Sequence, residues 1–367
     1  MVKRKLNTNS FFNEQKKENM KRLIFPLMIC FSCSALAQNA NEIPFLTKSF
    51  SNESIKRVIA ETAGGNISVS SVAASDVRVE VYIRPSNYNG NQTYSKEEIQ
   101  KRLEADYHFI LEASDNTIKA IAKNKNKNQN ISWKKALSIS YKIYVQKEIS
   151  TNLTTSGGNI VLSDLNGSQH FVTSGGNLDI ERLKGKIVGV TSGGNVSVID
   201  CSEDIELTTS GGNITADNCN GKISLVTSGG DIKLSKLNGT IEATTSGGNA
   251  MANDIRGALE AHTSGGNVNL RDLYCSVDAA TSGGNIFVSV KEIGNYVRIT
   301  NSSGQIELEL PSGKGLDLKL TASKIKTNQL NNFSGSMEEE EINGKLNGGG
   351  IPVTVKGGSG KINFTLK

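Results

Sequence analysis

Apolar and polar residues alternate in a pattern that recurs at a fixed interval through the middle of the chain. Each repeat is counted here from the Thr of a Thr-Ser-Gly-Gly-Asn/Asp segment. Positions six and eight are apolar in every copy, and position seven is mostly polar. Positions eleven and fifteen are further apolar positions, although Gln169 occupies position fifteen of the first copy. This period-two alternation predicts two half-buried strands in each repeat.

Eight copies follow one another without insertion or deletion, and they begin at Thr155, Thr173, Thr191, Thr209, Thr227, Thr245, Thr263 and Thr281. A constant register indicates that each residue stacks on its counterpart in the next repeat. We therefore predict an all-β fold. It is a parallel β-solenoid, or β-helix, with about 18 residues per coil, regular over residues 151–310.

The most regular residues of the repeat are best explained by the turns. The Gly-Gly pair is expected to permit positive φ, a Gly at position thirteen should do the same at the opposite bend, and the Asn should form a stacked amide ladder. The structural turn and ladder residues predicted in this way include Gly157, Gly158, Asn159, Gly175, Gly176, Asn177, Gly193, Gly194, Asn195, Gly211, Gly212 and Asn213.

The segments on either side of the array differ from it. Residues 42–150 contain one degenerate coil at Thr62–Val69, followed by a small α/β insertion. In that insertion Ser95–Glu98 resembles a capping box that opens a short helix. The Lys-Asn loop at Lys123–Asn130 is interpreted as a solvated hairpin tip, with anionic-polymer binding as the alternative. Residues 311–367 are expected to form terminal coils and a cap, because an uncovered sheet edge invites pairing.

The register changes after the last copy, where the period is interpreted as slipping by one residue to Thr300. The acidic run Glu338–Glu341 follows in the terminal segment. It is interpreted as protection of an exposed edge, with a cation or partner contact as the alternative.

The N-terminus has the features of a secretory signal peptide over residues 1–37: Lys21 and Arg22, an apolar run, and Ala35-Leu36-Ala37. Met20 is a candidate start of translation. Cys30 or Cys33 would be the lipidated residue of a lipoprotein. This segment holds seven of the 41 Lys and Arg residues and two of the 36 Asp and Glu residues, so the rest of the chain has 34 of each. The balance gives no reason to expect nucleic acid as a partner.

Three cysteines follow the predicted cleavage site. Cys201 and Cys219 are one repeat apart and should stack at about 4.8 Å, within the range that a disulfide tolerates. The preferred interpretation is that both thiols replace Leu in the core, with a disulfide as the alternative. Cys275 falls at a turn position without an evident partner.

Candidate chemistry is sparse. Glu242, Glu260 and Asp278 form an outward acidic column at position sixteen, which could bind a divalent cation or resemble a glycosidase pair. A solvated column is preferred because no basic or aromatic residue is found in the same phase. The charges at position ten are of mixed sign along the stack, which suggests mutual neutralisation. No cofactor, metal or catalytic residue is expected.

The Thr-Ser-Gly-Gly-Asn run and its lead-in Tyr144–Lys147 resemble the bacterial family of secreted β-strand-repeat proteins that carry an adhesin label and a domain of unknown function. The resemblance covers about residues 55–367. It implies a non-enzymatic exported scaffold that binds a polysaccharide or an envelope or surface protein. The expected location is the periplasm, the outer membrane surface or the exterior, without a transmembrane helix after cleavage. The alternatives are a polysaccharide-active β-helix enzyme and a periplasmic structural or sensing protein.

Overall fold

The structure is a computed structural model that describes residues 43–51, 53–86, 94–125 and 136–367. Residues Ile43–Lys367 form one compact unit. The predicted signal peptide lies outside the described residues. The described part contains 27 strands, one α-helix, α1 (Lys96–Asp106), and one 3-10 helix, η1 (Ala74–Asp76). The all-β prediction is confirmed.

Hydrogen bonds join the strands into two long ladders, named face A and face B, which share the continuous strands β17 (Ile232–Thr244), β18 (Ala250–His262), β19 (Val268–Thr281) and β20 (Ile286–Asn301). The other strands of face A, in spatial order, are β1 (Leu46–Ser49), β4 (Arg78–Pro85), β7 (Leu137–Val145), β3 (Ile67–Ser71), β9 (Ile160–Ser163), β11 (Leu178–Glu181), β13 (Val196–Ile199), β15 (Ile214–Asp217) and then, beyond the shared strands, β21 (Ile306–Leu310), β27 (Lys361–Leu366) and β23 (Lys324–Thr327).

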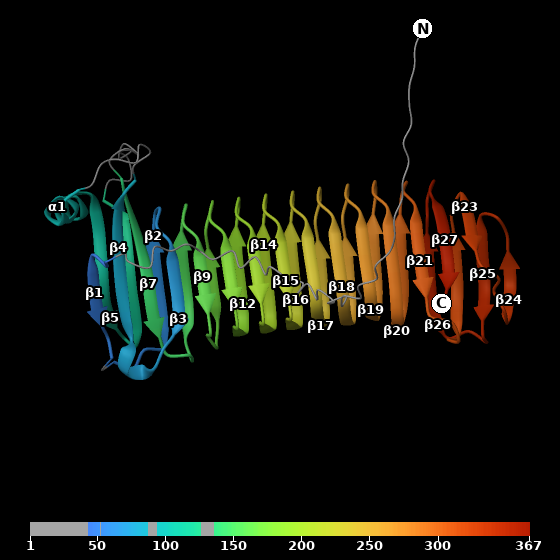
Figure 1. The fold of residues 1–367 in the computed structure, drawn as a ribbon, viewed down its shortest axis with the longest axis horizontal. Coiled ribbons are helices and arrows are strands. Elements are labelled where there is room, and N and C mark those ends of the chain that lie inside the picture. The colour runs from blue at the N-terminus through green and yellow to red at the C-terminus, as the bar shows by residue number, and fades with distance from the viewer. Residues whose placement is uncertain (1–42, 52, 87–93, 126–135) are drawn as a thin grey trace, which may run out of the picture. The chain divides into compact units, whose positions relative to one another are not determined.

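The other strands of face B, in the same direction, are β5 (Tyr107–Ser114), β6 (Thr117–Asn124), β2 (Arg57–Thr62), β8 (Ser150–Thr155), β10 (Gln169–Val172), β12 (Lys184–Thr191), β14 (Ser202–Thr209), β16 (Asn220–Thr227) and then β26 (Ile351–Lys356), β22 (Leu316–Thr321), β25 (Glu341–Leu346) and β24 (Phe333–Met337). Figure 1 shows the strands in a single row from β1 and β5 to β24.

The pairing follows the sequence repeat through the middle of the row. Val196 pairs with Ile214, its counterpart in the next repeat, and the pairing from β8 to β19 is parallel throughout. Antiparallel pairs among the described strands occur only toward the two ends, where β1–β4–β7 and β5–β6 lie at one end and β22–β25–β24 lies at the other. The parallel stack is therefore bordered by strands of a different arrangement.

The core lies between the faces and is filled by the predicted inward positions. Position eleven is represented by Leu183, which is buried. At position seventeen, large and small residues complement one another. The ring of Phe171 occupies the space that a side chain at Gly189 would need, so the two successive coils fill one layer together. Gln169 keeps its place in the core because its amide is satisfied by Thr151 Oγ1 (2.7 Å) and by the Ile149 carbonyl (2.7 Å).

The N-terminal end agrees in part with the predictions. The degenerate coil stacks directly below the array, with Ile67 paired to Ile160. Ser95 caps α1 by accepting the Glu98 N–H at 3.2 Å, as the capping box predicts. The prediction for the Lys123–Asn130 loop was wrong in one respect. Strands β6 and β7 belong to different faces and do not pair with each other, so these two strands do not form a hairpin. Residues 126–130 of the loop lie outside the described residues.

The period slips by two residues at the end of the array, not by one. Thr281 pairs with Asn301, and Ile286 pairs with Ile306, so this coil is longer than the regular ones. Asn301 takes the place of the motif Thr, since its Nδ2 donates to the Gly284 carbonyl at 2.8 Å and its Oδ1 accepts the Gly304 N–H at 3.1 Å. The amide of Asn can replace a hydroxyl here because it supplies both a donor and an acceptor.

Candidate binding surfaces

The Thr of each motif points inward and holds neighbouring coils together. Thr209 Oγ1 donates to the Gly194 carbonyl of the preceding coil at 2.8 Å and accepts the Gly212 N–H of its own coil at 3.2 Å. The side chain is 1% exposed, so both bonds lie in the core. The same pair of bonds recurs in all eight copies. The Thr row is therefore a structural device.

The Asn residues of the motif form a ladder between coils. Asn177 Oδ1 accepts the Asn195 N–H at 2.8 Å, and Asn195 Oδ1 accepts the Asn213 N–H at 2.8 Å. The chain of bonds runs from Asn66 to Gln305. Each side-chain oxygen satisfies a backbone N–H that the turn leaves without a partner. The four predicted Asn residues, Asn159, Asn177, Asn195 and Asn213, all belong to this ladder.

The Gly-Gly pair is required for a reason other than positive φ. Neither glycine of the pair adopts positive φ in any of the eight copies, so that prediction was wrong for Gly157, Gly158, Gly175, Gly176, Gly193, Gly194, Gly211 and Gly212. A Cβ on Gly212 would overlap the carbonyl of Gly194, while one on Gly211 would meet no atom closer than 3.7 Å. Close approach of neighbouring backbones therefore demands the second glycine alone.

The opposite bend contains the left-handed residues. Position ten has positive φ in each of seven successive copies, including Asp164 at 61°, Arg182 at 54° and Lys236 at 53°. The glycines at position thirteen have positive φ as predicted, and Glu203 adopts a φ of 93° where most other copies have Gly. The mixed charges do neutralise one another in part, since Arg182 binds both carboxylate oxygens of Asp164 at 2.6 and 2.8 Å. Hydrogen bonding to Arg182 lowers the pKa of Asp164.

The three described cysteines are free and buried. Cys201 and Cys219 occupy the Leu position of the core, where Cys219 Sγ accepts the Cys201 N–H at 3.4 Å and Cys201 Sγ donates to the Ile199 carbonyl at 3.2 Å. The structure therefore contains two stacked thiols and not the disulfide that was the alternative prediction. Burial raises the pKa of the Cys275 thiol to about 12, which keeps it protonated.

The acidic column lies on face B, as predicted from the phase. Glu242 pairs with Glu260, and Glu260 pairs with Asp278, on three successive strands. Ser224 Oγ lies 3.5 Å from a Glu242 oxygen. The column does contain a basic residue, because Arg298 is paired with Asp278 in the next strand. The prediction that no basic residue shares this phase was wrong, because the bulge in β20 shifts Arg298 out of the regular count.

Asp278 is the most enclosed member of the column. Its side chain is 16% exposed, with Arg298 at 2.9 Å and His262 Nε2 at 3.3 Å. The Asp278 carboxylate is therefore already engaged by two neighbouring side chains. No three described His, Cys, Asp or Glu side chains are close enough to hold a metal ion.

The acidic run in the C-terminal segment makes backbone contacts, while the side chains of Glu338, Glu339 and Glu340 stay exposed. The carbonyl of Glu340 accepts the Ala322 N–H at 3.0 Å, and that of Glu339 accepts the Ile325 N–H at 2.7 Å. Lys324 Nζ lies 2.6 Å from the Glu339 carboxylate. The run thus crosses between β22 and β23 and satisfies backbone groups there.

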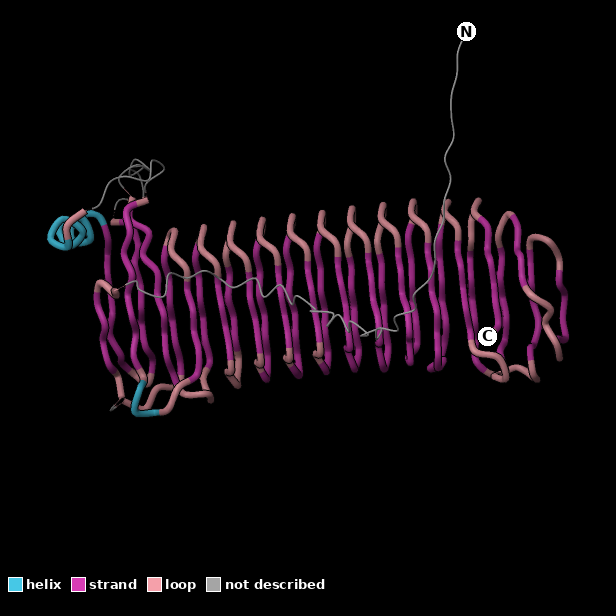
Figure 2. The backbone as a smooth tube through the Cα atoms, viewed as in Figure 1, coloured by secondary structure: helices cyan, strands magenta, loops and turns pink. Residues whose placement is uncertain are grey.

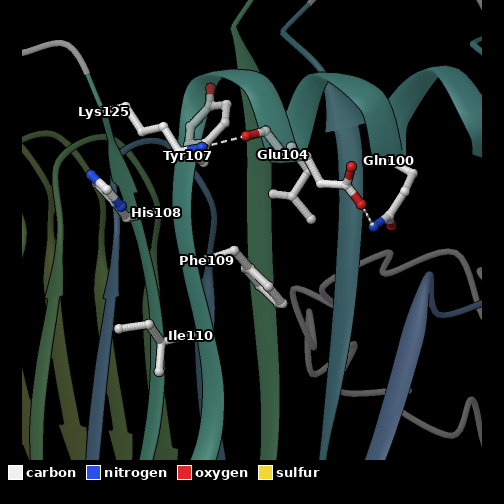
Figure 3. A pocket seen from close by; sticks show the side chains of 8 residues that line it. Gln100, Glu104, Tyr107, His108, Phe109, Ile110 and Lys125 are labelled. Atoms are coloured by element: carbon white, nitrogen blue, oxygen red, sulfur yellow. Dashed lines mark hydrogen bonds between the residues drawn. The ribbon is translucent and has the colours of Figure 1, made fainter.

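A hollow of about 590 Å³ lies between α1 and β5 at the N-terminal end. Figure 3 shows Phe109 along it, with Lys125 bonded to the Glu104 carbonyl and Gln100 bonded to the Glu104 side chain. Its polar groups are thus partly engaged with one another. The helix and these side chains cover the end of face B.

No helix among the described residues is long and apolar enough to cross a membrane. No curated protein matched the chain. A solved structure described as a "putative cell adhesion protein" from Clostridium sporogenes is 13% identical, with 88% of this chain and 98% of that chain covered and a TM-score of 0.20. A "putative adhesin" from Bacteroides fragilis is 13% identical, with 87% and 96% covered and a TM-score of 0.24.

Superpositions with TM-scores this low support no conclusion about fold or activity. The family described as Toastrack DUF4097 matches residues 79–365, which is most of the chain. The protein therefore belongs to the Toastrack DUF4097 family, in agreement with the resemblance drawn from its repeats.

Proposed function

We propose that the protein is an exported, non-enzymatic β-solenoid of regular coils, closed at both ends by antiparallel caps, that acts as an adhesin or envelope-binding scaffold. Its ligand is a polysaccharide or an envelope protein, bound through repeated weak contacts along the outward faces. The predicted signal peptide supports export to the periplasm, the outer membrane surface or the exterior.

One observation carries this proposal: three of the five motif residues serve contacts between neighbouring coils. The Thr hydroxyl, the second Gly and the Asn side-chain oxygen all serve contacts between coils. The outward residues of the strands, which differ from coil to coil, and the exposed Ser of the motif are left for binding. Within each outward column, neighbouring residues lie about 4.8 Å apart, which is the spacing of paired strands.

A row of equivalent sites suits multivalent binding. Linked weak contacts raise the overall affinity because each later contact forms within the complex already made. Three of the four terminal strands, β1, β5 and β24, are antiparallel to their neighbours and support the same role, since they border a parallel stack whose edges would otherwise be free to pair. The scaffold would then present its faces without polymerising through its ends.

The acidic column is better explained by structure than by catalysis. A glycosidase pair needs one carboxyl held protonated and a second one free. Asp278 is instead paired with Arg298 and faces His262. We accordingly assign the column no catalytic role. A Glu260→Gln variant that abolished a hydrolytic activity of the purified protein on neutral or acidic polysaccharides would overturn this assignment.

The proposal is tested by shortening the stack. Deleting residues 191–226 removes two whole coils and joins Val190 to Thr227, which keeps the repeat in register. We expect the shortened protein to fold, since each coil contacts only its neighbours. Its retention on immobilised envelope material should fall several-fold relative to the full stack, as distributed contacts require.

Equal retention of the folded short and full proteins would contradict distributed binding. Protease treatment of intact cells separates the locations: a surface adhesin is removed, whereas a periplasmic protein survives.

A further inference from the structure

Face A carries a hollow whose lining combines side-chain amides, a carboxylate and an aromatic ring. It encloses about 420 Å³ where the last regular coils meet the C-terminal strand. Its floor is a row of outward residues on four successive strands: Asn269 on β19, Phe287 on β20, Glu307 on β21 and Asn363 on β27. Figure 1 shows these four strands side by side.

The rim of the hollow is the end of the Asn ladder. Asn285 and Gln305 are both exposed there, and Asn285 Oδ1 accepts the Gln305 N–H at 2.8 Å. Their side-chain N–H groups have no partner among the described residues, and neither do the Asn363 amide and the Glu307 carboxylate. The hollow therefore offers several amide donors and acceptors together with one charged acceptor.

A partly exposed aromatic ring lies among these polar groups. The Arg271 guanidinium stacks over Phe287 at 4.4 Å from the ring centroid, and Arg271 Nε donates to Asn269 Oδ1 at 3.0 Å. These contacts restrain the ring within the outward row. An aromatic side chain with a few oriented polar groups is the usual composition of a small-ligand site.

We propose that this hollow is a binding subsite for a neutral saccharide. The Phe287 ring packs against the apolar C–H face of a sugar ring, and the amides with Glu307 hydrogen-bond its hydroxyls. The inference rests on the proposed scaffold function and names its ligand class at one place.

The charge of the lining decides between ligand classes. Among the residues that line the hollow, Glu307 is the one charged group. A phosphate or an acidic sugar would face this carboxylate inside the hollow, whereas hydroxyl groups donate to it directly. The Arg271 guanidinium beside the hollow is engaged with Phe287 and Asn269. The lining itself therefore favours hydroxyl groups over anionic groups.

The site takes its fourth strand from the C-terminal segment. Strand β27 returns from that end and pairs with β21 beyond the last regular coil. Asn363 thereby joins a row whose other members come from residues 269–307. Position seven in the preceding coils holds residues such as Lys233 and Met251, and it lacks this combination.

The experiment is a titration of the purified protein with neutral oligosaccharides, namely cellohexaose, laminarihexaose and mannohexaose, beside polygalacturonate. We expect binding of at least one neutral oligosaccharide, weakened at least tenfold by Phe287→Ala and by Glu307→Ala. Met251→Ala is the matched control. It truncates an outward apolar residue of the same row outside the hollow, and it should bind like the wild type.

Unchanged affinity of a folded Phe287→Ala protein would overturn the inference, as would binding of polygalacturonate alone. The two proposals fail separately. If the coil-deleted protein loses envelope retention and the full-length protein binds no saccharide, the scaffold function is supported and this subsite is contradicted. Saccharide binding that depends on Phe287, with equal envelope retention by both stack lengths, supports the subsite and contradicts distributed contacts.

Discussion

Each coil reverses direction at two bends, and the two bends differ in how much their sequence varies from coil to coil. At the motif bend, Thr, Gly and Asn recur almost without change, and Figure 2 shows a loop there in every regular coil. At the opposite bend, position ten holds Asp, Arg, Asn or Lys, and the strand runs on through that bend from β17 to β20. One bend is uniform and the other is variable.

The difference shows what makes a repeat position invariant. The motif bend brings neighbouring backbones so close that a Cβ on the second glycine would overlap a carbonyl. At the opposite bend, position ten asks only for a left-handed conformation, which several side chains adopt at a cost of about 1 kcal/mol. Position thirteen of that bend is closely approached as well, because a Cβ on Gly221 would overlap the Glu203 carbonyl. Contact between coils therefore fixes sequence more strictly than backbone conformation does.

The largest effect is expected at the motif bend. Gly212→Ala should destabilise the protein by about 3 kcal/mol or more, because the added methyl overlaps the Gly194 carbonyl. Gly211→Ala is the matched control and should leave stability within about 1 kcal/mol, since its methyl would meet no atom closer than 3.7 Å. Chemical denaturation of both variants measures the difference. Equal loss in the two would contradict the close-approach explanation.

A smaller loss is expected when the hydroxyl alone is removed from the same bend. Thr209→Val keeps the shape but leaves the Gly194 carbonyl and the Gly212 N–H unpaired in the core, at a cost of about 1–3 kcal/mol. The neighbouring outward Thr208→Val should cost little. If the two variants unfolded at the same denaturant concentration, the hydroxyl would not be holding the coils together.

At the opposite bend, one substitution is expected to stabilise the folded protein. Glu203 adopts a φ of 93° at a position where Gly is found in the neighbouring coils. Glu203→Gly is expected to gain about 1 kcal/mol by removing this strain. Glu206→Gly, in the ordinary strand that follows, should instead lose about 0.5–1 kcal/mol. A melting temperature lowered by Glu203→Gly would show that the bend does not store strain.

The smallest effect concerns the charges of the opposite bend. The Asp164 carboxylate is 39% exposed, so its pair with Arg182 should contribute less than about 1 kcal/mol. Because Arg182 lowers the pKa of Asp164, this contribution is present above about pH 4 and is lost as the pH falls through the folded-state pKa. Melting curves from pH 2 to pH 7 should differ between wild type and Arg182→Ala only at the higher pH values. A constant difference would exclude the ion pair as its cause.

The sequence alone was sufficient for the features that depend on period. The inward columns, the Asn ladder, the capped helix at Ser95 and the acidic column on face B all follow from counting residues. These predictions succeed because the pairing keeps a constant offset through the regular coils.

The remaining features depend on contacts that the period does not encode. The bulge in β20 puts Arg298 beside Asp278, and the return of β27 from the C-terminal segment puts Asn363 in the row of Phe287. Neither pairing could be found by phase, because both cross a change of register. The one visible signal was an aromatic residue at position seven, a mostly polar position.

The account separates residues that build the stack from residues that bind, and one paired measurement tests this separation most directly. Melting temperature and affinity for the best neutral oligosaccharide are determined on Thr209→Val and on Phe287→Ala. We predict that Thr209→Val melts at a lower temperature and binds normally while folded, and that Phe287→Ala melts near the wild-type temperature and binds at least tenfold more weakly. Loss of affinity in folded Thr209→Val, or normal affinity in Phe287→Ala, would contradict it.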